Sequence, residues 1–140
     1  MKTLYFLCLL IFLGSFSPTV NAVDVIVHLS VSENNVTTSQ LRRIYTMRQT
    51  QWPDGQPIVV FVLPKQHSLH QRFSKERLQI FPYQLERIWN KLTYSGLGVA
   101  PILVSTPEAL IVAVMKTPGA IGYAETIVDK GVVNVINIEK

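Results

Sequence analysis

An uninterrupted run of six apolar residues, Ile58–Leu63, is the feature of this 140-residue chain that most constrains its fold. The run is rich in β-branched and aromatic types and shows no polar alternation, which is typical of a strand covered on both faces. Pro64 ends the strand because proline lacks a backbone N–H. Ser68 then stands where the N-cap of a helix is expected. A buried strand that leads directly into a helix predicts an α/β sheet.

This strand-to-helix turn is the best candidate for a binding site. The first turn of a helix carries unpaired backbone N–H groups and the positive end of the helix dipole, and both favour anions. In open α/β sheets, ligands bind at the carboxyl ends of the strands. We therefore expect a small oxyanion to bind near Lys65, His67, Ser68, Leu69 and His70. The alternative is that Ser68 is a plain N-cap and that both histidines are solvated.

The other segments predict the layers around this strand. Apolar residues at helical spacing predict helices over residues 40–47, 68–78 and 82–94, and a fourth that begins at Pro107, with Thr106 as its cap, and ends before Pro118. Further strands are expected at residues 23–29, 102–104, 120–124 and 132–138, and a loop at residues 30–36. Strands that alternate with helices predict a mostly parallel central sheet flanked by helices.

Single residues outside the turn mostly indicate packing. Thr38 or Ser39 is expected to cap the first helix. Trp52 and Trp89 are interpreted as buried or half-buried, with Trp52 the better candidate for an exposed contact. Gly119 is interpreted as a helix stop and Gly122 as a close backbone approach within a strand.

The N-terminus predicts an export signal. A short basic start precedes an apolar segment, Leu4–Leu13, and Val20–Ala22 is a small-x-small cleavage site. Residues 1–22 are therefore expected to be a cleavable signal peptide, and residues 23–140 a single periplasmic domain. The apolar segment is too short for a comfortable membrane span. Cys8 lies inside it, so the mature chain is expected to lack disulfides.

Charge and motifs argue against several classes of function. The net charge is +4, but the basic residues are scattered instead of forming a stripe, so nucleic-acid binding is not expected. No Ser/His/Asp, Cys/His or paired-carboxylate pattern stands out, so we do not expect an enzyme. The three histidines, at positions 28, 67 and 70, lack a carboxylate or thiolate at ligand spacing, so neither a metal site nor a cofactor is predicted.

Several of these segments together resemble the periplasmic phosphate-binding proteins of ABC importers. The helix Leu41–Tyr45 is followed by Trp52, a turn at Asp54–Gly55, the apolar strand, and later Trp89. The most specific match is Pro118–Tyr123, Pro-Gly-Ala-Ile-Gly-Tyr. These motifs occur in the family's order and cover nearly the whole mature chain.

The resemblance implies one lobe of a type II periplasmic-binding-protein-like fold, the lobe inserted between two hinge crossings. It implies that strand 23–29 is the incoming crossing and that the chain leaves the lobe after Tyr123. The family places an arginine after the central strand and Ser-Gly-Thr at the helix start. Here Leu63 stands close to the arginine position, and Ser68 is the family-like hydroxyl that can be carried over. The lost arginine is a bidentate donor suited to phosphate.

Two functions remain open from the sequence. The first is a solute-binding module for phosphate or another small oxyanion, linked to ABC-type uptake and a membrane permease. The second is a protein-recognition module that has lost its ligand and docks on a periplasmic sensor, an envelope complex or a second copy of itself.

Overall fold

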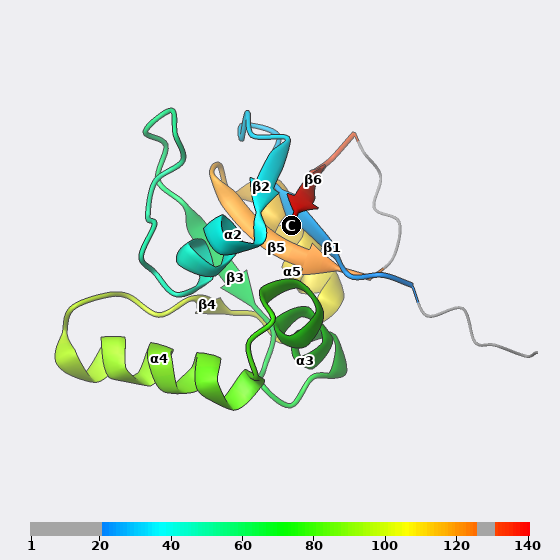
Figure 1. Cartoon of the computed structure of the whole chain (residues 1–140). Helices are drawn as coiled ribbons and strands as arrows, with labels where there is room; N and C mark the ends of the chain where they lie inside the picture. The colour runs from blue at the N-terminus through cyan, green and yellow to red at the C-terminus, as the bar shows by residue number, and fades with distance from the viewer. Residues whose placement is uncertain (1–20, 126–130) are drawn as a thin grey trace, which may run out of the picture.

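The computed structural model describes residues 21–125 and 131–140, so nearly all of the predicted signal peptide, residues 1–22, lies outside the described part. Within the described residues, no helix has both the length and the apolar character needed to cross a membrane. The described chain folds into one mixed sheet with helices on both faces (Figure 1).

Six strands form the sheet in the order β2-β6-β1-β5-β3-β4. They are β1 (Asp24–Val27), β2 (Asn35–Thr37), β3 (Val59–Val62), β4 (Ile102–Leu103), β5 (Ala120–Ala124) and β6 (Asn134–Glu139). The pairs β2/β6, β3/β5 and β3/β4 are parallel, whereas β1 is antiparallel to both β5 and β6. Since β1 alone runs against the other described strands, the predicted mostly parallel α/β sheet is confirmed.

Helices cover the sheet from two sides. They are α2 (Thr38–Tyr45), α3 (Ser68–Phe73), the π-helical turn η1 (Ser74–Leu78), α4 (Pro82–Ser95) and α5 (Pro107–Lys116). Helix α5 packs against β1, β3 and β5 on one face. Helices α2 and α3 lie on the other face, where Tyr45 and Phe73 pack against Tyr123 of β5. The segment Val60–Leu63 is buried between these layers, as the apolar run predicts.

Three local predictions were wrong at the level of single residues. Thr37, not Thr38 or Ser39, caps α2, because its hydroxyl accepts the Gln40 N–H at 3.0 Å. His67, not Ser68, caps α3 through its Nδ1 atom. Asn35 and Val36, expected in a loop, form β2 together with Thr37, because they pair with β6, which lies far later in the chain.

Gly122 has the close backbone approach that the sequence predicted. Gly119 does not stop the helix, because α5 already ends with Thr117 as its C-cap; it lies in the turn that leads into β5. Gly119 has φ +77°, and a Cβ atom there would lie 2.2 Å from the Pro57 carbonyl oxygen. At Gly122, a Cβ atom would lie 2.8 Å from Val114 of α5, so the glycine lets the helix approach the sheet. Trp52 is buried and its Nε1–H donates to the Gly119 carbonyl at 3.0 Å, so it belongs to the core and not to an exposed contact.

The carboxyl-terminal segment departs from what the family resemblance implied. That resemblance has the chain leave the lobe after Tyr123, but residues Asn134–Glu139 return to the same sheet as β6. Strand β6 lies between β1 and β2 and pairs with both. The returning strand satisfies backbone groups of β1 that would otherwise form an exposed sheet edge.

The glycine geometry predicts a large loss of stability for Gly119→Ala. The added Cβ meets a backbone oxygen that cannot move away, and the left-handed φ disfavours alanine, so we expect a loss of about 3 kcal/mol or more. Gly96→Ala is the matched control, because Gly96 also has a positive φ (+67°) but has open space around it. Its expected loss is about 1 kcal/mol. Urea denaturation of both variants measures the difference, and equal losses would contradict the role given to the Pro57 contact.

Candidate ligand-binding site

The candidate site lies at the sheet edge where β3, β4 and β5 end. These strands are parallel, so their carboxyl ends meet at one edge, and α3 and α5 begin there. A cavity of about 320 Å³ opens between the end of β3 and helix α4. Its lining residues are Val62, Leu63, Pro64, Lys65, Gln66, Glu86, Trp89, Asn90, Thr93, Ala100, Pro101 and Leu103. The cavity therefore adjoins the turn that the sequence singled out.

The hydroxyl of Tyr123 joins β5, β3 and α3 at this edge. Its oxygen accepts the backbone N–H of Leu63 at 2.8 Å and lies 2.6 Å from Nδ1 of His70. When Nδ1 of a neutral His70 carries no proton, it accepts the hydroxyl proton of Tyr123 in this hydrogen bond. Burial raises the pKa of Tyr123, although the Leu63 hydrogen bond works against that rise. The phenol thus remains protonated and holds α3 beside the end of β3.

His70 is a buried structural group and not an exposed ligand. Its side chain is about 1% exposed and its ring lies 5.9 Å from that of Trp89. Burial lowers the pKa of His70 to about 4, and the charge of His67 adds to this, whereas Glu86 partly opposes it. At neutral pH the imidazole is therefore uncharged, so Nδ1 can accept the Tyr123 proton.

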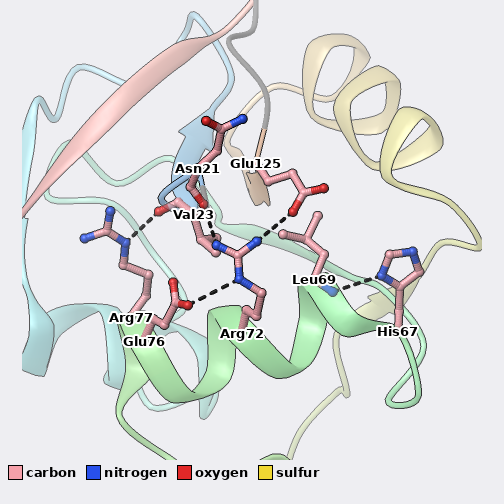
Figure 2. Close-up of polar contacts among 8 residues, drawn as sticks. All are labelled: Asn21, Val23, His67, Leu69, Arg72, Glu76, Arg77 and Glu125. Atoms are coloured by element: carbon pink, nitrogen blue, oxygen red, sulfur yellow. Dashed lines mark hydrogen bonds and ion pairs between the residues drawn. The ribbon is translucent and has the colours of Figure 1, made fainter. Parts of the chain in front are cut away.

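The other four predicted site residues lie around the start of α3 and differ in their burial and in their partners. Leu69 is buried, and its backbone N–H donates to Nδ1 of His67 at 3.1 Å (Figure 2). Lys65 forms an ion pair with Glu86 across the cavity at 3.2 Å. Ser68 is exposed on the first turn of α3. The turn thus presents the Ser68 hydroxyl and the half-exposed Lys65 ammonium to solvent, while the Leu69 and His70 side chains point into the core.

Sequence reasoning missed the arginine that organises the far side of this edge. Arg72 of α3 contacts Glu125 at 2.7 Å and Glu76 at 3.2 Å, and it also donates to the Asn21 carbonyl oxygen (Figure 2). Arg77 donates to the Val23 carbonyl at 2.6 Å. The two arginines tie the start of β1 and the end of β5 to α3 and η1. The sequence offered little sign of this, since Glu125 is distant from Arg72 along the chain.

The arginines of α2 have structural partners. Nε of Arg42 donates to the Leu78 carbonyl at 2.6 Å, and its Nη2 donates to the Gln79 side chain at 3.0 Å. Arg43 reaches Ser39 of its own helix at 3.3 Å. Among the described residues, no group of three or more His, Cys, Asp or Glu side chains is arranged to hold a metal ion.

Two buried tyrosines give a matched test of the Tyr123 bridge. Tyr123→Phe leaves the Leu63 amide and His70 Nδ1 without their partner, so we expect a loss of about 2–3 kcal/mol in unfolding free energy. The Tyr45 hydroxyl is buried and has no hydrogen-bond partner among the described residues. Tyr45→Phe is therefore expected to be neutral or to stabilise by about 1 kcal/mol. Urea denaturation measures both, and a larger loss for Tyr45→Phe would refute this assignment.

The lowered pKa of His70 predicts a pH-dependent stability. The unfolded chain binds a proton near pH 6.5, whereas folded His70 resists protonation until about pH 4. The stabilisation is therefore complete above pH 6.5 and declines as the pH falls toward 4, by roughly 2–3 kcal/mol. His70→Gln keeps an acceptor for Tyr123 but does not titrate. The free-energy difference between the two proteins, measured at intervals from pH 7.5 to 4, should change over this range, and a constant difference would show that His70 does not titrate as described.

Comparisons with known proteins agree with this geometry at the level of the fold. A scan of the sequence against protein-family models and a search of curated proteins both found no match. Among solved structures, an ABC-type phosphate transport receptor from Vibrio cholerae matches 86% of this chain with a TM-score of 0.63 and 21% identity. A putative phosphate ABC transporter substrate-binding protein from Clostridium perfringens, solved with bound phosphate, matches 84% with a TM-score of 0.65 and 20% identity. PstS from Borrelia burgdorferi matches 84% with a TM-score of 0.59 and 18% identity.

The length of the match defines which part of those proteins this chain reproduces. The chain spans less than half the length of each, 47%, 45% and 47% respectively. The similarity therefore covers a single lobe-sized unit, as the order of sequence motifs implied. The described chain has the fold of one lobe of the phosphate-binding receptors of ABC transporters, which are type II periplasmic binding proteins.

Proposed function

We propose that this chain is an exported solute-binding module that takes a small oxyanion, such as phosphate, at the start of α3. The single observation that carries the proposal is the handover from β3 to α3 at the carboxyl edge of the sheet, with the exposed Ser68 in the first turn. The fold neighbours include a protein solved with bound phosphate. Binding, and not catalysis, is the role that these neighbours favour.

The proposed contacts are the Ser68 hydroxyl, the Lys65 ammonium, the imidazole of His67 and the amide dipoles of the first helical turn. The side chains of Leu69 and His70 are buried and make no contact with the anion, so only the His70 backbone contributes, because the Leu69 N–H is bonded to His67. The helix dipole favours an anion at this end of α3. We place the module in the periplasm and in ABC-type phosphate uptake, where a permease is the expected downstream partner.

The charge arrangement implies weak binding. Lys65 is already paired with Glu86, and no arginine stands directly after β3, so the bidentate donor that suits a phosphate dianion is missing at the turn. The Leu69 amide is occupied by His67. We expect a dissociation constant for phosphate on the order of 1 mM, corresponding to about 4 kcal/mol of binding free energy.

Calorimetric or NMR titration with inorganic phosphate at constant ionic strength tests this proposal. Ser68→Ala and Lys65→Gln should each weaken binding at least threefold, and Lys116→Gln, an exposed lysine in the last turn of α5, is the matched control and should leave it unchanged. Glu86→Gln should strengthen binding, because it releases Lys65 and removes a nearby negative charge. Absence of a response to phosphate, sulfate and other oxyanions at millimolar concentration would reject the site.

Protein recognition without a ligand is the second candidate. It is favoured by the internal pairing at the turn, where His67, Lys65 and His70 all have partners within the chain. In that case, none of the four variants in the oxyanion titration should differ from the unmodified protein. Cross-linking from position 68 in cells should instead capture a periplasmic protein. A response to phosphate that depends on Ser68 argues against this candidate.

A further inference from the structure

The far end of α4 and the segment that follows it are unusually apolar for an exposed surface. No charged residue lies between Lys91 and Glu108 in the sequence. In the structure, Tyr94, Leu97 and Val99 are 90%, 85% and 81% exposed, and Leu103 is 65% exposed. We call Tyr94, Leu97 and Val99, which lie at and just after the end of α4, the apolar tip; Leu103 lies apart from it in β4. Exposed aliphatic and aromatic side chains gathered in one segment commonly mark an interaction site.

The apolar tip lies on a projection of the molecule. Figure 1 shows α4 extending away from the sheet, with the chain turning back at its far end toward β4. The described part of α4 buries only Leu85 completely. Behind the tip, the apolar surface continues into a cavity of about 420 Å³, which no charged side chain lines and to which Leu97 and Val99 contribute. The exposed side chains of the tip can therefore insert into an apolar environment without any rearrangement of the sheet.

The solvent side of α4 carries cations next to the tip. Tyr83, Arg87, Lys91 and Tyr94 are all exposed, and their spacing places them on one stripe of the helix. This stripe is opposite the apolar stripe that contains Leu85. The single acid of α4, Glu86, is paired with Lys65. The stripe therefore presents two positive charges between two tyrosines.

We propose that the apolar tip and the Arg87–Lys91 stripe form a docking surface for a bilayer that contains anionic phospholipids. Tyrosine side chains favour the boundary between headgroups and acyl chains, and aliphatic side chains favour the region below it. Lysine and arginine close to the surface are attracted to anionic headgroups. The positive charges beside the tip favour a surface of anionic headgroups over a neutral protein groove.

Vesicle flotation with the purified protein tests the docking surface. All variants are prepared with the same N-terminus, verified by mass spectrometry, so that residues 4–13 contribute equally. The protein should float with vesicles of phosphatidylethanolamine and phosphatidylglycerol and bind at least tenfold more weakly to phosphatidylcholine. Leu97→Glu with Val99→Glu, and separately Arg87→Glu with Lys91→Glu, should each reduce binding to anionic vesicles at least tenfold. Val112→Glu, at an exposed apolar position of α5, is the matched control and should bind as the unmodified protein does.

A label at the tip gives a second readout that the N-terminal segment does not affect. In a Cys8→Ser background, an environment-sensitive fluorophore on Leu97→Cys should shift to the blue on anionic vesicles, whereas one on Val112→Cys should not. Since both side chains are exposed, these changes are expected to leave the unfolding midpoint unchanged. Equal shifts at both positions, or binding that survives Leu97→Glu with Val99→Glu, would overturn the proposal. Self-association that this double variant abolishes, without vesicle binding, would instead assign the tip to contact between copies and would also overturn it.

Discussion

The arrangement of the candidate site depends on one buried hydroxyl. Tyr123 accepts the N–H of Leu63, directly after β3, and donates to His70 in the first turn of α3. It thereby holds a strand and the following helix in the geometry that brings a helix start to the sheet edge. Because the pair is buried and uncharged, it carries no cost of an isolated charge in the core. The position of the candidate site therefore depends on this buried hydrogen-bonded bridge and not on the exposed residues that would contact a ligand.

The same bridge explains why the turn has limited capacity for anions. A histidine that must be neutral and buried to support Tyr123 cannot also be an exposed cation. The cap of α3 is another histidine, His67, which occupies the Leu69 amide. The nearest lysine, Lys65, is balanced by Glu86. At this turn, most polar groups already have partners within the chain. Few exposed polar groups therefore remain to contact a ligand.

The two sides of the sheet differ in how they are packed. On one side, β6 returns to pair with β1 and β2, and Arg72 and Arg77 bind the chain near Asn21, Val23 and Glu125. On the other side, β4 is a two-residue edge strand with exposed side chains. The chain is less than half as long as the phosphate receptors whose fold it shares. Strand β2 at one edge and β4 at the other are thus both short edge strands, and the exposed apolar side chains lie at and beside β4.

The sequence by itself determined the layers. The apolar run Ile58–Leu63 predicted the central strand, the helical spacing predicted the α4 stripe, and Gly122 predicted a close backbone approach, because these are local consequences of burial and backbone geometry. Tertiary structure alone decided β2, the burial of His70 and the pairing of Arg72 with Glu125, since each depends on residues more than fifty positions away. Sequence patterns report which face of an element is apolar, but not which distant group it meets. For that reason the sequence predicted where the strand-to-helix turn lies. Which of its side chains are buried, paired or exposed depends on residues that only the folded structure brings near.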